Sequence, residues 1–356
     1  MEGVLALLGI NIGIDLGTTS VITYQEGKGI IMSEPSIVAY RKSTGRMIAV
    51  GRPAYKLLGR EPRSVVTVRP MKDGVVSNFS VTEQMLRYFI RKICGNEIFK
   101  PNIVVSMPGT VTNLERRTIL DVITSSGAGR ACLMEEPLAA AIGAGVDPLQ
   151  PNGTMIVDLG GGTTDVAVIT MGSVAVASSV KVAGNALNEA VAKYCKRERN
   201  VVIGEQTAEA IKKKIGGAVL RDPQIAMVAK GKDYITGMPV EFEITSDEVY
   251  YAIRECRRAI LGAVHEVLER TPPELASDIL QEGIILTGGT AMLFGLADAV
   301  EKSTGIPTRV ADDPVNCVAN GLGSVLDHLE LLEQDGYLFM TRQDITGVVN
   351  DEKEDF

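Results

Sequence analysis

Short apolar runs alternate along the chain with longer stretches in which apolar residues recur every three or four positions. The short runs, at 10–14, 103–105, 155–157 and 284–286, predict buried strands, and the longer stretches predict amphipathic helices. Strands and helices that alternate in this way are typical of an α/β protein with mostly parallel or mixed central sheets.

Capping signals indicate where three of the helices begin. Ser80 and Glu83 have the spacing of a capping box. The apolar residues after them share one helix face: Met85, Leu86, Phe89, Ile90 and Ile93. Thr112 and Glu115 repeat the spacing before a helix expected to end near Thr124. A third helix is expected from about residue 245, with an inward face of Val249, Ile253, Ile260, Val264 and Val267.

One segment of the chain is echoed by another. Residues 12–19 are Ile-Gly-Ile-Asp-Leu-Gly-Thr-Thr, and residues 156–164 are Ile-Val-Asp-Leu-Gly-Gly-Gly-Thr-Thr. In each segment an apolar strand ends in Asp-Leu-Gly, which predicts two similar lobes. Glycine permits a tight turn, and the hydroxyls and backbone N–H groups around it suit a polyanion.

Asp15 and Asp158 are the informative residues of these two segments. A bare carboxylate repels a phosphate, so each makes sense there only with a divalent cation between, most simply Mg²⁺ held largely through water. The alternative is a glycine turn that the Asp merely caps, and a single loop is open to that interpretation. Two matching loops in one chain favour phosphate binding.

Two carboxylates, Glu135 and Glu136, end another predicted strand, and Pro137 opens the helix after them. One of the pair is suited to orient or deprotonate a water molecule that attacks a γ-phosphate. The alternative is that acidic side chains at a helix start simply suit the helix dipole. Taken alone, the residues favour this structural interpretation.

The segment 284–291 again turns from a strand through paired glycines, here into a helix expected over 292–303. Such a turn lets a nucleotide approach the backbone closely, although Gly-Gly turns are common. Glu209 and Lys212 lie three apart on one predicted helix face, where they suit ribose hydroxyls and adenine. An ordinary surface ion pair is the alternative for these two residues.

Composition narrows the classes of function. The 356 residues suffice for two or three domains, and 45% apolar with 22% charged residues is the profile of a globular protein. A net charge of −8, no Trp and 4% aromatic residues argue against a nucleic-acid partner. Five scattered cysteines and two histidines predict no disulfide framework, zinc site or histidine triad, and they favour a reducing cytosol.

The two ends of the chain differ in character. The apolar run at 4–10 has no basic flank and falls short of the about 20 residues that a membrane span needs, although it permits contact with a membrane surface. The acidic stretch at 336–356 has no helix or strand period and is predicted to be a mobile tail.

Taken in order, these elements resemble those of the actin-like ATPases, the superfamily of actin, seventy-kilodalton chaperones and sugar kinases, and most of all the MreB family of bacterial actins. The resemblance covers about 10–332, and it is carried by the segments 29–31, 34–39, 69–74, 135–143, 271–275, 313–314 and 317–319. It implies an actin-like ATPase fold: two lobes of duplicated ribonuclease H-like sheets flanked by helices, four subdomains, and a nucleotide in the cleft.

The resemblance also implies boundaries. Lobe I would cover 1–143, with subdomain IA at about 1–32 and 75–143, IB at about 33–74, and a C-terminal helix at about 316–335 that returns to IA. Lobe II would cover 144–315, with IIA at about 144–181 and 246–315 and IIB at about 182–245.

Roles follow from the resemblance by position. Phosphates and Mg²⁺ would be held by Asp15, Thr18, Thr19, Ser20, Asp158, Gly160, Gly161 and Gly162. Glu136 and Thr163, together with Asp158, would carry the hydrolysis of ATP. Glu209 and Lys212 would contact the nucleoside, and the adenosine side would be lined by Gly288, Gly289, Thr290 and Ala291. The chain departs from many MreB sequences at 19–20, at Asp165 and at Thr290.

The function that the resemblance implies is a slow ATPase that polymerises into cytoplasmic filaments on the inner face of the cell membrane and organises cell-wall elongation and rod shape. Its partners would be further copies of itself, the membrane, and cell-wall elongation membrane proteins. Ile98 and Phe99 would meet the lipid, although the two residues alone favour the interpretation as loop-to-core anchors. The alternatives are a phosphotransferase or sugar kinase on the same fold, a chaperone ATPase domain, and a plasmid-segregating actin.

Overall fold

The computed structural model describes residues 10–95 and 100–326. The run at 4–8, Ile98, Phe99 and the stretch at 336–356 lie outside these residues. The chain divides into two compact units, the first made of Met1–Asn152, Ile169–Ala177 and Val315–Phe356 and the second of Gly153–Val168 and Ser178–Pro314. Within the described ranges, every helix is too short or too polar to cross a membrane.

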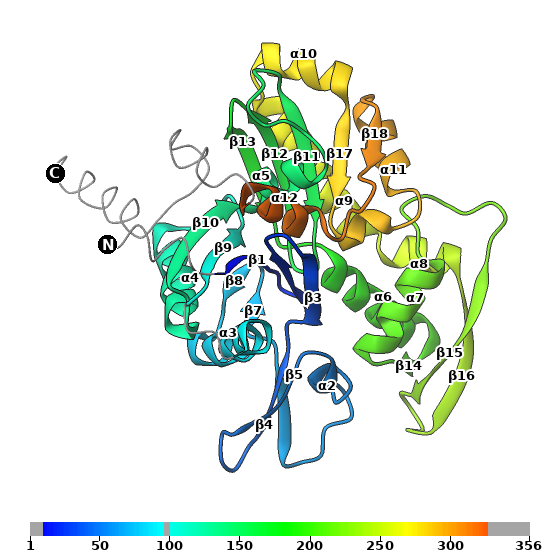
Figure 1. The fold of residues 1–356 in the computed structure, drawn as a ribbon. Coiled ribbons are helices and arrows are strands. Elements are labelled where there is room, and N and C mark those ends of the chain that lie inside the picture. Colours follow the sequence, from blue (N-terminus) through cyan, green and yellow to red (C-terminus); the bar gives the residue numbers. More distant parts are fainter. Residues whose placement is uncertain (1–9, 96–99, 327–356) are drawn as a thin grey trace, which may run out of the picture. The chain divides into compact units, whose positions relative to one another are not determined.

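A five-stranded sheet forms the centre of the first unit (Figure 1). Its order is β10 (Arg130–Glu135), β9 (Asn102–Met107), β1 (Asn11–Leu16), β2 (Ser20–Gln25) and β3 (Gly29–Pro35). The strands β10, β9 and β1 run parallel, whereas β2 is antiparallel to both β1 and β3. The predicted strands at 10–14 and 103–105 are β1 and β9, so both predictions are confirmed.

The two faces of this sheet carry different side chains. Ile12 and Ile14 of β1 share a buried cluster with the apolar faces of α3 (Phe79–Cys94) and α4 (Asn113–Ser126). On the other face, Gly13 admits α12 (Cys317–Leu326), because a Cβ at Gly13 would lie only 2.8 Å from Cβ of Leu322. α12 also packs on α5 (Glu136–Gly143), whose small residues 139–141 are fully buried.

Two smaller pieces follow β3 in the chain. A three-stranded sheet contains β5 (Met47–Val50), β4 (Val38–Arg41) and β6 (Val65–Val68), and it shares a small core with α2 (Arg52–Tyr55). A hairpin of β7 (Met71–Lys72) and β8 (Val75–Val76) then leads into α3.

The other five-stranded sheet repeats the order of the first. Its order is β18 (Thr308–Val310), β17 (Ile284–Thr287), β11 (Thr154–Leu159), β12 (Thr164–Thr170) and β13 (Ser173–Val180). β11 is parallel to β17, and β17 is parallel to β18. In both sheets the strand that ends in Asp-Leu lies between the strand that follows it directly and a parallel strand from much later in the chain. The duplication predicted from the sequence echo is therefore confirmed, as are the strands at 155–157 and 284–286.

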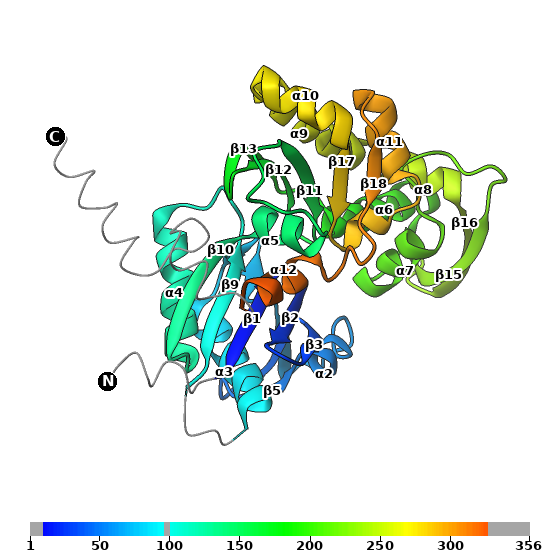
Figure 2. The same ribbon diagram turned by 45° about the horizontal axis from the view of Figure 1, so that its top comes forward.

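The remaining elements of the second unit form a small lobe and a helical cover. The small lobe contains α6 (Gly184–Arg199), α7 (Glu205–Ile215) and the sheet of β14 (Val201–Val202), β15 (Ala226–Asp233) and β16 (Pro239–Thr245), which share one core. α8 (Ser246–Ala252) adds Val249 to this core. The cover contains α9 (Arg254–Arg270), α10 (Pro273–Glu282) and α11 (Leu296–Thr304). α10 packs on β11 and α11 on β18 (Figure 2).

The helix starts partly match the sequence. A capping box forms as predicted at α4, by Thr112 and Glu115. Another forms at α8, by Thr245 and Glu248, where the sequence predicts a helix start. The prediction for α3 is wrong: the helix begins two residues earlier, because the side chain of Asn78 accepts the N–H of Val81 at 3.1 Å. The face predicted for α3 is nevertheless the one that packs into the core.

The helix predicted from residue 245 is two helices. α8 ends at Ala252 and α9 begins at Arg254, because Ile253 between them has φ −90° and ψ 8°. This turn places Ile253 beside Val249 in the core of the small lobe, whereas Ile260, Val264 and Val267 are buried along α9. The predicted inward residues are therefore correct although the helix is not continuous.

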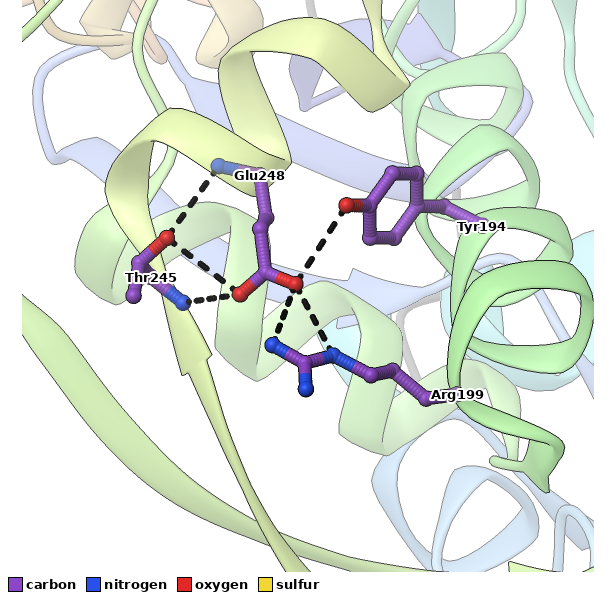
Figure 3. A network of polar contacts seen from close by, with 4 residues as sticks. All are labelled: Tyr194, Arg199, Thr245 and Glu248. Carbon is purple, nitrogen blue, oxygen red and sulfur yellow. Dashed lines mark hydrogen bonds and ion pairs between the residues drawn. The ribbon is translucent and has the colours of Figure 1, made fainter.

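A polar network joins the end of α6 to the start of α8 (Figure 3). One carboxylate oxygen of Glu248 accepts hydrogen bonds from Arg199, at 2.9 Å from Nε and 2.6 Å from Nη2, and from the Tyr194 hydroxyl at 3.3 Å. The other accepts the backbone N–H of Thr245 at 3.0 Å. Burial acts to raise the pKa of Glu248, but the bonds from Thr245 and Arg199 outweigh it and hold the pKa below its usual value.

Candidate functional site

The first Asp-Leu-Gly turn lies at the end of β1. A Cβ at Gly17 would lie 2.9 Å from the carbonyl oxygen of Ser20, so the turn into β2 requires glycine. Asp15 is only 8% exposed and accepts a hydrogen bond of 3.1 Å from the hydroxyl of Ser106 in β9. Burial raises the pKa of Asp15 to about 6 against the opposing effect of Ser106. The turn therefore holds a carboxylate that water solvates poorly.

The threonines of this turn also hold it to its neighbours. Thr18 Oγ1 accepts the backbone N–H of Gly74, between β7 and β8, at 2.9 Å. The carbonyl of Thr19 accepts the N–H of Ser36 at 2.9 Å, and Ser20 begins β2. A hydroxyl that accepts one hydrogen bond can still donate another, so the Thr18 hydroxyl keeps a hydrogen that it can donate to a phosphate.

The paired carboxylates lie where β10 meets α5. Glu135 ends the strand and is the N-cap residue of α5, and Glu136 is the first residue of the helix. Glu135 forms an ion pair with Arg116 of α4, with 3.5 Å between Oε1 and Nη2. Burial raises the pKa of Glu135, and the charge of Arg116 opposes that rise. Arg116 thus links α4 to the point where β10 meets α5.

The second Asp-Leu-Gly turn lies at the end of β11. Asp158 is 3% exposed, and its Oδ1 accepts the hydroxyl of Thr287 in β17 at 2.7 Å. The N–H of Gly160 donates to the carbonyl of Thr163 at 3.0 Å, which closes the turn across Gly161 and Gly162. Thr163 is buried beside Asp165, where burial raises the pKa of the Asp165 carboxyl.

The start of α6 meets this turn. The carbonyl of Gly160 accepts the N–H of Gly184 at 3.2 Å, and the carbonyl of Gly161 accepts the N–H of Asn185 at 2.8 Å. The hydroxyl of Thr290 also donates to the carbonyl of Gly160, at 2.8 Å. Thr290, where the chain departs from many MreB sequences, therefore joins the turn after β17 to the turn after β11.

Lys212 of α7 completes this cluster. Its Nζ donates to the carbonyl of Gly184 at 3.0 Å, and burial lowers its pKa to about 8 against the opposing attraction of Glu209. A Cβ at Gly184 would lie 2.9 Å from Oγ1 of Thr290 and 3.3 Å from Nζ of Lys212, so a larger side chain there would displace both polar groups. The surface ion pair of α7 is formed by Glu209 with Lys213, at 2.6 Å, rather than with Lys212.

The paired glycines after β17 lead into a short 3₁₀ helix and not into an α-helix, so the helix predicted over 292–303 is wrong in its start. Gly288 has φ 82°, and a Cβ there would lie 2.4 Å from the carbonyl oxygen of Leu159. Gly289 begins a short 3₁₀ helix, η1 (Gly289–Met292), in which Thr290 and Ala291 are buried. α11 starts only at Leu296, because Gly295 interrupts the chain in a left-handed conformation.

The structure brings the predicted residues of the second unit into one connected cluster. Direct contacts join its members: Asp158 with Thr287, Gly160 with Thr290 and Gly184, Gly184 with Lys212, and Gly288 with Leu159. In the first unit, Asp15, Thr18, Thr19 and Ser20 form one turn, and Glu136 lies on a different element. Within residues 10–95 and 100–326, no group of three or more His, Cys, Asp and Glu side chains forms a metal cage.

Sequence reasoning misses three residues that contact these motifs, Ser106, Arg116 and Gly184. It includes Thr287 in the segment 284–291 but misses its contact with Asp158. Each lies far along the chain from the motif that it contacts. Thr287 is the last residue of β17 and Ser106 the last but one of β9. Only the strand order that brings them beside Asp158 and Asp15 identifies them as hydrogen-bond donors.

Two sheets of the same strand order, each with an Asp-Leu-Gly turn after its central strand, define the actin-like ATPase fold. The family model described as MreB/Mbl protein matches residues 9–334. The chain belongs to the MreB/Mbl family.

Relatives and solved structures agree with this placement. The chain is 44% identical over 324 residues to the cell shape-determining protein Mbl of Bacillus subtilis, covering 90% of this chain and 97% of that protein. It is 42% identical over 327 residues to the cell shape-determining protein MreB of Escherichia coli, covering 90% and 94%. The structure of MreB5 of Spiroplasma citri bound to AMPPNP is similar with a TM-score of 0.88 at 35% identity, covering 92% of this chain and 99% of that one.

Proposed function

We propose that this chain is a membrane-associated actin-like ATPase that polymerises into cytoplasmic filaments and organises cell-wall elongation and rod shape. The observation that carries the proposal is the pair of buried carboxylates, Asp15 and Asp158, at equivalent strand ends in a chain of the MreB/Mbl family. The names of the relatives, which are cell shape-determining proteins, support the cellular role.

The chemistry of the two turns supports binding of ATP with Mg²⁺. Carboxylate oxygens are ligands that Mg²⁺ prefers, usually with water between. The pKa of Asp15, which burial raises to about 6, indicates a negative charge that a cation would stabilise. When bound, the ion neutralises phosphate charge. We assign Asp15, Thr18, Thr19 and Ser20 of the first turn, and Asp158 with 160–162 of the second, to the phosphates and Mg²⁺.

Glu136 is assigned to the water that attacks the γ-phosphate. Glu136 is the first residue of α5, so the helix fixes the position of its backbone. Glu135 beside it forms an ion pair with Arg116. Thr163, at the end of the second turn, is assigned the same task, and Asp158 belongs with them through its part in the metal site. Hydrolysis of this kind depends chiefly on positioned water and neutralised phosphate charge.

The nucleoside is assigned to the cluster around Gly184. Lys212 and Glu209 lie on α7, and residues 288–291 form the turn and the 3₁₀ helix that Thr290 joins to Gly160. The AMPPNP bound by the similar Spiroplasma protein supports a nucleotide as the ligand of this chain.

The subdomain boundaries are also proposed. The range 33–74 contains β4, β5, β6 and α2, and the range 182–245 contains α6, α7, β14, β15 and β16. Each range has a small sheet and core of its own, which supports treating it as a subdomain.

Membrane attachment is assigned to Ile98 and Phe99, with Lys100 available to anionic headgroups. Family membership supports this assignment, as it supports the inner face of the membrane as the location and cell-wall elongation proteins as partners. Polar substitution of both residues is expected to weaken pelleting with liposomes, and equal pelleting of the double variant would move the contact elsewhere in the chain.

Electron microscopy of the purified full chain on lipid monolayers tests the proposal as a whole. Filaments are expected with ATP and Mg²⁺ and not when EDTA replaces the magnesium, and inorganic phosphate release is expected to depend on protein concentration. Absence of both filaments and phosphate release would overturn the proposal. Transfer of phosphate to a sugar in a coupled assay would instead establish a kinase on this fold.

A further inference from the structure

Each buried carboxylate of the two turns receives a hydroxyl from the neighbouring parallel strand. Ser106 Oγ of β9 donates to Oδ1 of Asp15 at 3.1 Å, and Thr287 Oγ1 of β17 donates to Oδ1 of Asp158 at 2.7 Å. All four side chains are buried, with at most 8% of any residue exposed. Both contacts therefore lie out of bulk water, where a hydrogen bond to a charged oxygen is strong.

The two hydroxyls occupy equivalent places in the duplicated sheets. Asp158 is the register partner of Thr287 in the parallel pair β11 and β17. Asp15 and Ser106 directly follow Ile14 and Val105, which are register partners in the parallel pair β1 and β9. The sequences around the hydroxyls differ, since Ser106 is followed by Met-Pro-Gly and Thr287 by Gly-Gly-Thr. The same donor thus recurs at the same place although the local sequences do not match.

A hydrogen bond to one oxygen fixes the rotation of a carboxylate group. Without it, an Asp side chain turns broadly about its second torsion angle, because the barrier for that bond is low. Burial alone does not select an orientation, whereas a donor in a rigid neighbouring strand does. Thr287 is the stiffer donor of the two, since its branched Cβ restricts the first torsion angle.

We propose that Ser106 and Thr287 are positioning residues that orient Asp15 and Asp158 toward the hydrated magnesium ion of a bound nucleotide. This inference rests on the proposed function, because it assumes that both carboxylates act on Mg²⁺. The role assigned to the hydroxyls is to set the direction in which each carboxylate presents its charge. Thr287 contributes more than Ser106, because its contact is shorter and its side chain is fully buried.

Titration of ATP binding with Mg²⁺ tests this inference on the full chain. Thr287→Val keeps the shape of the side chain and removes the donor, and Thr287→Ser keeps the donor. The Mg²⁺ concentration at half-saturation is expected to rise about tenfold in Thr287→Val and about threefold in Ser106→Ala, the range of a lost charge-assisted hydrogen bond. Thr287→Ser is expected to stay near the wild type. Binding of ATP in EDTA is expected to be the same in all variants.

Thr271→Val is the matched control in the second unit. It also removes a buried hydroxyl, one that donates to the carbonyl of Val267 at 2.6 Å and lies on no turn of the site. Its Mg²⁺ dependence is expected to equal that of the wild type. Equal Mg²⁺ dependence of Thr287→Val and Thr271→Val, or equal losses with Mg²⁺ and with EDTA, would overturn the positioning role.

Two results separate this inference from the proposed function. A wild-type chain that binds ATP with a clear dependence on Mg²⁺, while Ser106→Ala and Thr287→Val behave like it, defeats the inference alone. A wild-type chain whose ATP binding does not depend on Mg²⁺ overturns both. Ser106→Ala lies in the other unit, so it decides the question even where Thr287→Val does not fold.

Discussion

Gly321 of α12 lies against the backbone of Ala139 in α5, so closely that a Cβ at Gly321 would fall 1.9 Å from the carbonyl oxygen of Ala139. The contact is reciprocal, because a Cβ at Gly143 of α5 would fall 1.8 Å from the carbonyl oxygen of Cys317. The two helices can pack at this distance only with hydrogen in place of a side chain at both positions. Glu136 lies at the start of the same α5, so this packing also fixes the helix that carries the assigned catalytic carboxylate.

Gly321→Ala is expected to destabilise the folded chain by about 2–3 kcal/mol, because the added methyl group forces two helix backbones apart. The shift of the urea midpoint measures this effect. Gly262→Ala is the control: Gly262 lies inside α9, and a Cβ added there would meet no atom within 4 Å, so alanine is expected to stabilise by about 0.5–1 kcal/mol. Equal midpoints for the two variants would contradict the close packing.

Glu136→Ala is expected to leave ATP binding nearly intact and to slow phosphate release by about 100-fold or more, the usual contribution of a positioned acid or base. Single-turnover phosphate release measures it. Glu274→Ala removes a carboxylate from the first turn of α10 and controls for the helix dipole. An unchanged rate of phosphate release in Glu136→Ala, or an equally reduced rate in both variants, would contradict the catalytic assignment of Glu136.

Lys212 is expected to make nucleotide affinity depend on pH. Its pKa is about 8, so a rise from pH 7 to pH 9 removes most of its positive charge and is expected to weaken ATP binding about tenfold. The free energy of unfolding is expected to change in the opposite direction and to rise with pH. Between about pH 8 and pH 10.5, Lys212 of the unfolded chain keeps a proton that Lys212 of the folded chain has lost.

Calorimetric titration of ATP at pH 7 and pH 9 measures the change in affinity. Lys212→Met is expected to bind weakly at both values of pH and to lose the added dependence. Lys213→Met, which removes the exposed partner of Glu209, is expected to keep the wild-type dependence. A wild-type affinity that is flat between pH 7 and pH 9 would show that Lys212 does not face the nucleotide.

Glu248→Gln is expected to destabilise the chain by about 1–3 kcal/mol at pH 7, because the carboxylate that accepts from Arg199 loses its charge and its charge-assisted hydrogen bonds. The folded pKa of Glu248 lies below the unfolded value of 4.5, so its contribution is present above that pH and is lost as the pH falls through the folded value. Urea unfolding at pH 7 and pH 3 is expected to show a difference between variant and wild type that shrinks at the lower pH.

Glu241→Gln is the control for this network. Glu241 pairs with Lys230 on the exposed face of the β15–β16 hairpin, where solvent screens the two charges and the ion pair adds little to stability. An equal loss of unfolding free energy in Glu241→Gln and Glu248→Gln would show that the network in Figure 3 stabilises the chain no more than an exposed ion pair does.

Sequence patterns predict the parts of the fold that depend on neighbours in the chain. The four apolar runs are strands, Thr112 and Glu115 cap α4, and the echo of Asp15 and Asp158 marks a duplicated sheet. Each of these features depends on residues that are close together in the sequence: an apolar period, a cap spacing or a glycine turn. Ile253 shows the limit: its apolar character fits a continuous helix, and only the core of the small lobe, which draws its side chain inward, explains the turn.

The candidate site divides in the same way. The Asp-Leu-Gly turns and the paired glycines are identifiable from the sequence, because each is a contiguous motif. The donors Ser106 and Thr287 are not, because a hydroxyl at the end of an apolar strand has no local signature and gains its partner from strand order. Lys212 is identifiable as part of the site, but its contact with Gly184 depends on the packing of α7 against α6.

The helix α6 is hydrogen-bonded at both ends, so it connects the Gly160 turn to the start of α8. Gly184 at its start is bonded to the turn at Gly160, and Arg199 at its end is bonded to Glu248. Its 16 residues give an arm of about 24 Å, so a tilt of about 5° at the turn moves the far end by about 2 Å. A small tilt at the Gly160 turn would therefore become a larger displacement at the sheet of β14, β15 and β16, which follows α6 in the chain.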